Sequence, residues 1–217
     1  MALLLGRWQE FSDLRTLADV RLTRGRERHT LSGVLLARAP ASVRFEALSP
    51  FGQPLLLAVM HAGQFTAYNA ATTRATVGPA TADTAARLIG LAIDPDDLVG
   101  ALAGRPLPPR DLRIAELMPP DEHGPSLAMV GRDHSKRVWM DLVTGAVSQL
   151  EITGGRYEVR IAYRHSGDGA LAGFELSAAR GSLTADVRYR QPVFDGGIEQ
   201  ERFQLTLPEG AKIERLR

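Results

Sequence analysis

The sequence contains no cysteine, which excludes disulfide bonds, thiolate zinc sites and a cysteine nucleophile. It also contains only two lysines, Lys136 and Lys212, so arginine supplies nearly all of the positive charge. The formal net charge of +1 gives no indication of the strongly basic surface that nucleic-acid binding usually requires. With 217 residues, of which 44% are hydrophobic and 24% charged, the chain has the composition of an ordinary globular protein. We therefore expect a folded domain that binds no nucleic acid.

Long apolar runs are also missing. No stretch approaches the roughly 20 apolar residues of a membrane-spanning helix. The run Ala2-Leu3-Leu4-Leu5 is shorter than the ~7–15-residue apolar centre of a signal peptide, and no cleavage site follows it. Two interpretations stay open: the protein is cytoplasmic, or this chain is a mature form whose leader has been removed.

Sequence signatures of catalysis are scarce. The five histidines are scattered without metal-ligand spacing such as H-E-x-x-H, and the chain has no G-x-S-x-G elbow, no P-loop and no G-x-G-x-x-G motif. The acidic residues Asp94, Asp96 and Asp97 are explained by a helix start, where carboxylates cap the backbone and complement the helix dipole. We expect no enzyme activity, no catalytic residue, no cofactor and no metal site.

The segment from Ser42 to Met60 is predicted to be a β-hairpin. Apolar and polar residues alternate from Val43 to Leu48, and the leucine-rich run from Leu55 to Met60 follows as the return strand. Between them, Ser49-Pro50-Phe51-Gly52 has the composition of a tight turn. Turn tips normally carry polar residues because they lie in water. Phe51 therefore either folds back onto the core or is offered to an apolar partner outside.

Most of the remaining pattern is also that of β-strands. The alternation is clearest in Tyr157–Arg164 and Leu183–Arg190, which predicts an antiparallel sheet with one apolar and one charged face. Apolar residues at helical spacing predict a helix over Trp8–Asp19, and Arg202–Leu207 is predicted as the last strand. A turn is expected at Arg180-Gly181. The interior tyrosines are interpreted as ordinary strand residues: Tyr157, Tyr163 and Tyr189.

The periodicity changes to that of helices between residues 81 and 104. Thr81 is a suitable N-cap for a first helix, and Asp94 followed by Pro95 is a strong start for a second, which Gly104 ends. The apolar faces of the two predicted helices contain Leu88, Ile89, Leu98 and Leu102.

A long antiparallel sheet must curl, split or close, and an isolated helical insert usually covers one face or one open end of such a sheet. We therefore predict a single domain over residues 1–217. Its fold would be mostly β with a helical insert, a curled antiparallel sheet around an apolar interior. That interior is either a filled core or a ligand cavity.

Several segments recur in the order known from one protein family. They are Leu31-Ser32-Gly33, Arg44 to Leu57 with its Ser-Pro-Phe-Gly turn, the helical insert from Thr81 to Pro108, Met140 to Gly145, and Pro208-Glu209-Gly210-Ala211. This order resembles that of the outer-membrane lipoprotein-sorting proteins LolA and LolB, and LolB most closely. The resemblance spans most of the chain and rests on order and spacing.

The resemblance implies a half-open β-barrel closed by a lid of short helices, about residues 81–104, whose apolar cavity holds acyl chains. The four apolar lid residues named above would line that cavity. In LolB-like proteins a protruding turn carries a large apolar residue that contacts the membrane, and Phe51, between Pro50 and Gly52, stands at that position. The implied partners are a lipid or acylated lipoprotein, the membrane surface and a periplasmic carrier protein.

The resemblance also implies a location at the periplasmic face of the outer membrane. LolB-like proteins are lipoproteins anchored through an N-terminal cysteine, so we expect that leader and anchor are absent from this chain. Two alternatives stay open: an envelope structural or interaction module with a filled core, and a small-molecule enzyme that uses the cavity.

Overall fold

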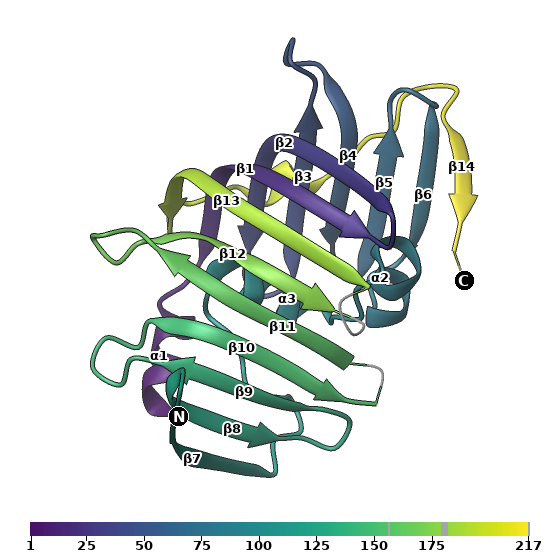
Figure 1. Cartoon of the computed structure of the whole chain (residues 1–217). Coiled ribbons are helices and arrows are strands. Elements are labelled where there is room, and N and C mark those ends of the chain that lie inside the picture. The colour runs from purple at the N-terminus through teal and green to yellow at the C-terminus, as the bar shows by residue number, and fades with distance from the viewer. Residues whose placement is uncertain (156, 179–181, 217) are drawn as a thin grey trace.

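The structure is a computed structural model that describes residues 1–155, 157–178 and 182–216, so the turn expected at Arg180-Gly181 lies outside the described residues. Fourteen strands of this part of the chain form one sheet in the order β14-β6-β5-β4-β3-β2-β1-β13-β12-β11-β10-β9-β8-β7 (Figure 1). The strands are β1 (Asp13–Arg24), β2 (Glu27–Arg38), β3 (Ser42–Leu48), β4 (Pro54–His61), β5 (Gln64–Asn69), β6 (Arg74–Pro79), β7 (Ile114–Asp121), β8 (Gly124–Val130), β9 (Ser135–Met140), β10 (Val147–Gly154), β11 (Tyr157–His165), β12 (Leu171–Ala178), β13 (Leu183–Phe194) and β14 (Lys212–Arg215).

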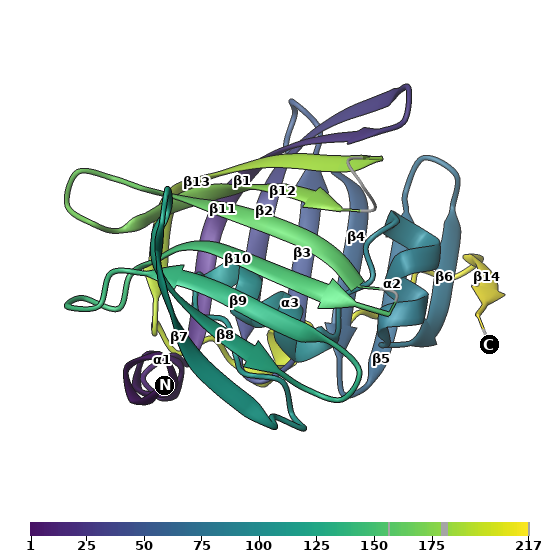
Figure 2. The same cartoon turned by 60° about the horizontal axis from the view of Figure 1, so that its bottom comes forward.

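The sheet is curled and open, as predicted. All neighbouring strands are antiparallel except β14, which pairs with β6 in parallel. The helices are α1 (Ala2–Gln9), α2 (Ala82–Ile89) and α3 (Pro95–Ala103). The sheet curves around α3, and α2 lies toward β5 and β6 (Figure 2). This arrangement confirms the predicted mostly-β fold with a helical lid. No helix among the described residues is long and apolar enough to cross a membrane.

Alternating burial along the strands explains why the sheet has two different faces. On β11, Val159 and Ile161 are buried, whereas Glu158 and Arg160 are exposed. Residues directly opposite each other on neighbouring strands face the same side, and Ile161 is opposite the buried Leu176 of β12. The apolar residues therefore line the concave face, and the charged residues cover the convex face.

The predicted helix over residues 8–19 is wrong in its extent. The helix ends at Gln9, and β1 begins at Asp13, where it pairs with β2 and β13. Leu14 and Ala18 are both buried, and their spacing of four residues fits both a helix and a strand. Thr16 decides between the two periods, because it is also buried and thus follows the period of two.

The predicted strand over residues 202–207 is also wrong. This segment begins within a 3-10 helix (Gln200–Phe203) and packs on the convex side of the sheet, where Phe203, 1% exposed, contacts Leu36 and Val59 in a small second core. The guanidinium of Arg44 donates hydrogen bonds of 2.8 and 3.1 Å to two of its carbonyls. The true last strand, β14, was not predicted.

The N-cap of α2 gives a first testable prediction. The hydroxyl of Thr81 accepts a hydrogen bond of 3.2 Å from the backbone N–H of Thr84, as the sequence predicts. Thr81→Ala should lower the free energy of unfolding by about 1 kcal/mol, because one backbone donor of the first turn loses its partner. Urea unfolding would measure this loss. Thr81→Ser is the control and should unfold like the wild type, and an equal loss in both variants would contradict the capping role.

Candidate functional site

The candidate site is the concave interior of the sheet, which α3 occupies. Val99, Ala101, Leu102 and Ala103 are all buried, and they belong to the same core cluster as the concave side chains of the strands. Figure 2 shows α3 between the two curled halves of the sheet. The helix therefore covers apolar surface that the open sheet would otherwise expose.

Two tyrosine hydroxyls tie the C-terminal half of α3 to the sheet. The hydroxyl of Tyr163 on β11 donates a hydrogen bond of 3.0 Å to the carbonyl of Ala101. The hydroxyl of Tyr189 on β13 donates one of 2.8 Å to the carbonyl of Leu102. Burial raises the pKa of both tyrosines, so the hydroxyls keep the protons that they donate. These two bonds fix the position of the C-terminal half of α3 relative to β11 and β13.

Acidic side chains tie the N-terminal end of α3 to β9 and β11 of the same half of the sheet. Asp94 accepts a hydrogen bond of 2.9 Å from the hydroxyl of Tyr157 on β11. Asp97 forms an ion pair with Lys136 on β9, and both side chains are buried, 7% and 2% exposed. The ammonium group of Lys136 also donates a hydrogen bond of 3.0 Å to the carbonyl of Leu107. The lid is thus held by polar contacts at both ends and by apolar packing along its length.

Two opposing effects act on the pKa of Asp97. Burial raises the pKa of the Asp97 carboxyl, and the nearby charge of Lys136 opposes this shift. The ring of His134 lies on Tyr157, with its Nε2 3.9 Å from the second carboxylate oxygen of Asp97, and this nitrogen has no hydrogen-bond partner among the described residues. These groups, with Arg110, line a polar pocket of about 270 Å³ at the end of the lid.

Sequence reasoning missed most of the groups that hold the lid. It explained Asp94 and Asp97 by helix capping, and it gave the tyrosines no role. One sequence feature could have identified Lys136 as a buried residue. On β9 it shares the inward parity of Val138 and Met140, so it is a charged residue on an otherwise apolar face. A lysine at such a position in a chain with only two lysines indicates a buried ion pair.

The structure places the predicted lid residues differently on the two helices. Leu102 of α3 is buried and Leu98 is half-buried against the core cluster, so both face the interior. On α2, Leu88 is half-buried and Ile89 is 42% exposed, and neither belongs to that cluster as described. The interior is therefore lined mainly by α3, and α2 contributes Ala82 and Ala85 rather than the predicted Leu88 and Ile89.

Phe51 lies at the tip of the β3–β4 turn and is 91% exposed, so its ring does not fold back onto the core. The hydroxyl of Ser49 accepts hydrogen bonds from the N–H groups of Phe51 and Gln53, and Gly52 adopts the left-handed conformation that closes the turn. Pro50 is exposed beside the ring. The turn presents a large apolar side chain to the surroundings on an ordered support.

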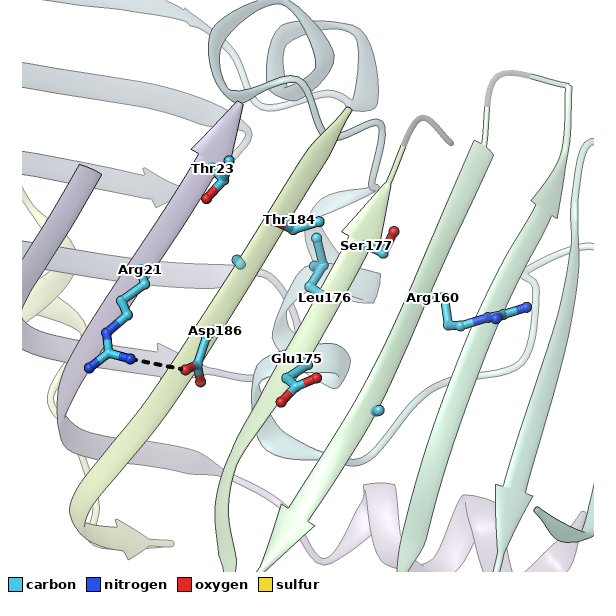
Figure 3. Close-up of a pocket in the computed structure, with 10 residues that line it drawn as sticks. Arg21, Thr23, Arg160, Glu175, Leu176, Ser177, Thr184 and Asp186 are labelled. Atoms are coloured by element: carbon cyan, nitrogen blue, oxygen red, sulfur yellow. Dashed lines mark ion pairs between the residues drawn. The ribbon is translucent and has the colours of Figure 1, made fainter. Parts of the chain in front are cut away.

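A second hollow, of about 370 Å³, lies on the convex face across β1, β11, β12 and β13 (Figure 3). Its charged groups neutralise one another. Arg21 lies 3.9 Å from Asp186, and Arg164 forms ion pairs with Glu175 and Asp186. Within the described ranges, no group of three or more histidine and acidic residues could hold a metal ion. The arrangement is that of a solvated, ion-paired strand surface.

No family model and no curated protein matches the sequence. Among solved structures, an outer-membrane lipoprotein-sorting protein domain from Vibrio parahaemolyticus is similar at 11% identity and TM-score 0.61, covering 93% of this chain and 94% of that one. A LolA superfamily protein from Nitrosomonas europaea is similar at 10% identity and TM-score 0.60, with coverages of 94% and 96%. A DUF1329 family protein from Desulfovibrio piger has 11% identity and TM-score 0.62, with coverages of 94% and 95%. The chain therefore has a LolA-like fold, which confirms the predicted resemblance at the level of the fold.

Proposed function

We propose that the protein is a non-enzymatic carrier that binds acyl chains of a lipid or lipoprotein in the concave interior of the sheet. The observation that carries this proposal is the position of α3, a largely apolar helix that lies in a half-open sheet and is tied to it by a few polar contacts. Acyl chains would enter when α3 moves out. The fold shared with lipoprotein-sorting proteins supports this function.

The energetics of exchange are favourable to such a mechanism. An acyl chain gains roughly 0.8 kcal/mol for each CH₂ group that leaves water. A chain of about fifteen methylenes therefore gains about 12 kcal/mol, which offsets the loss of the packing and hydrogen bonds of α3. No cofactor or energy source is required if transfer runs toward the acceptor with higher affinity.

We further propose a LolB-like role at the periplasmic face of the outer membrane, with a lipid anchor that precedes this chain. A periplasmic carrier would deliver the acylated cargo. The Pro50-Phe51-Gly52 turn would contact the bilayer during release, and the exposure of Phe51 supports this contact.

The tyrosine bonds to α3 give a direct test of lid opening. Tyr189→Phe leaves the buried carbonyl of Leu102 without its donor, and Tyr163→Phe removes one of the two donors to the carbonyl of Ala101, the other being the N–H of Gly104. Each substitution should raise the rate of fluorescent fatty-acid uptake, by about tenfold or more for Tyr189→Phe. Stopped-flow fluorescence would measure the rate. Tyr68→Phe on β5 is the matched control, because its half-buried hydroxyl forms no hydrogen bond in the described structure. Equal uptake rates in all four proteins would rule out α3 as the barrier.

The close packing of α3 also favours a second candidate, an envelope interaction module with a filled core and no ligand. The two candidates predict different behaviour. A filled-core module would take up no fatty acid in either tyrosine variant, and both substitutions would affect only stability.

A further inference from the structure

Phe51 projects from the end of the strands at which three turns of β1 to β6 occur. Strands β1 to β6 alternate in direction, so the β1–β2, β3–β4 and β5–β6 turns come at the same end of the strands. Because β14 runs parallel to β6, its first residue Lys212 also lies there, directly opposite Arg74. Figure 1 shows the β3–β4 and β5–β6 turns and the start of β14 pointing the same way. We call these three turns and the start of β14 the Phe51 rim.

The Phe51 rim carries unpaired positive charge on both sides of the β3–β4 turn in the strand order. The β1–β2 turn is on one side, and the start of β6 and β14 is on the other. Its five cations are exposed and form no ion pair or side-chain hydrogen bond in the described structure, whereas arginines of the convex face are ion-paired. Glu27 of the β1–β2 turn lies 3.8 Å from His29, and Glu209 and Glu214 flank Lys212 in the chain. The five cations are Arg24, Arg26, Arg28, Arg74 and Lys212.

The opposite end of the strands carries acidic turns. Asp121 lies at the β7–β8 turn, Asp141 at the β9–β10 turn and Asp168 at the β11–β12 turn. Hydrogen bonds from neighbouring groups of each turn hold the pKa of these three carboxyls below the ordinary value, so they are ionised at neutral pH. The same end also carries Arg15 and Arg38, and Asp121 forms an ion pair with Arg137.

We propose that the Phe51 rim is an interaction surface for an anionic lipid membrane. The proposal rests on the membrane contact of Phe51 and names the lipid class that this contact requires. Guanidinium groups bind phosphate through paired hydrogen bonds, and a large apolar ring enters the acyl region between the headgroups. The far-end carboxylates that form no ion pair within the described part of the chain, Asp141 and Asp168, are repelled by the same surface, which favours approach with the rim first.

The apolar tip favours a membrane over a polyanion such as nucleic acid. Non-specific binding to the phosphates of nucleic acids needs only cationic side chains on the protein. Here an almost fully exposed phenylalanine accompanies the cationic segments. A membrane is the partner that uses both features at once.

Vesicle flotation of the full chain tests this surface. Vesicles of phosphatidylcholine alone are compared with vesicles that also contain phosphatidylglycerol, at low and at high salt. We expect binding to the anionic vesicles only, and loss of that binding at high salt. Arg26→Gln/Arg28→Gln should weaken binding about 25-fold, roughly fivefold for each charge removed. The matched control, Arg15→Gln/Arg38→Gln, removes the same charge from the other end of the same hairpin and should bind like the wild type.

The outcomes separate this inference from the function on which it rests. One outcome is binding to both vesicle types that does not depend on salt and is lost in Phe51→Ser. It would support the membrane contact of Phe51 and overturn the proposed preference of the rim for anionic lipid. Salt-sensitive binding that both double variants weaken equally would overturn it as well, because net charge alone would then explain the attraction. Equal binding to duplex DNA and to anionic vesicles, unchanged in Phe51→Ser, would replace the membrane with a polyanion.

Discussion

Replacing Lys136 with methionine is expected to lower the free energy of unfolding by about 3–5 kcal/mol at neutral pH. The substitution leaves the buried carboxylate of Asp97 without its counter-ion, and an unpaired buried charge is strongly destabilising. Lys136→Met/Asp97→Leu is the control, because it replaces the pair by apolar side chains and should recover most of the loss. Chemical denaturation of the three proteins would measure these differences.

The loss of unfolding free energy in Lys136→Met should increase as the pH rises. Burial raises the pKa of Asp97 above its ordinary value, and removal of Lys136 removes the charge that opposes this shift. The folded state then holds the Asp97 proton more strongly than the unfolded state, so stability falls as pH rises through the folded-state pKa. The defect should therefore be small near pH 4 and full at about pH 7. A defect of equal size at both pH values would contradict the burial of an ionised Asp97.

The second large effect is expected for Leu102→Asp. A carboxylate at this buried position of α3 disfavours the closed lid, and a closed lid competes with acyl chains for the interior. Apparent affinity for a fluorescent fatty acid should rise about 100-fold, because the open form no longer costs the packing of α3. Ile89→Asp on the exposed side of α2 should leave both stability and affinity unchanged.

A loss of affinity in Leu102→Asp would have a different meaning. It would show that α3 stays in contact with the acyl chain and forms part of the cavity wall, which contradicts displacement. Leu98→Asp, at a half-buried position of the same helix, gives the same comparison with a smaller effect on folding.

Much of the fold could be predicted from local pattern. The β3–β4 hairpin, the alternating strands and both lid helices follow from period, turn residues and caps that lie within a few residues of one another. The errors lie where one pattern fits two structures, as for Leu14 and Ala18, or where the signal is too short, as for the four residues of β14.

The candidate site was less predictable because its contacts depend on register. Whether Tyr163 and Tyr189 reach α3 is decided by which strands become neighbours across β12, and no local feature of either segment carries that information. Asp97 and Lys136 are separated by 38 intervening residues, and only the curled sheet brings them together. Phe51 was identifiable because its signal, an aromatic ring in a tight turn, is local.

Native mass spectrometry of the protein purified from cells, with extraction and identification of any bound lipid, tests the central claim most directly. We predict a co-purifying phospholipid or acylated peptide, with higher occupancy in Leu102→Asp than in the wild type. A ligand-free mass for both proteins, together with no uptake of added lipid by either, would contradict the claim that the interior is an acyl-chain site.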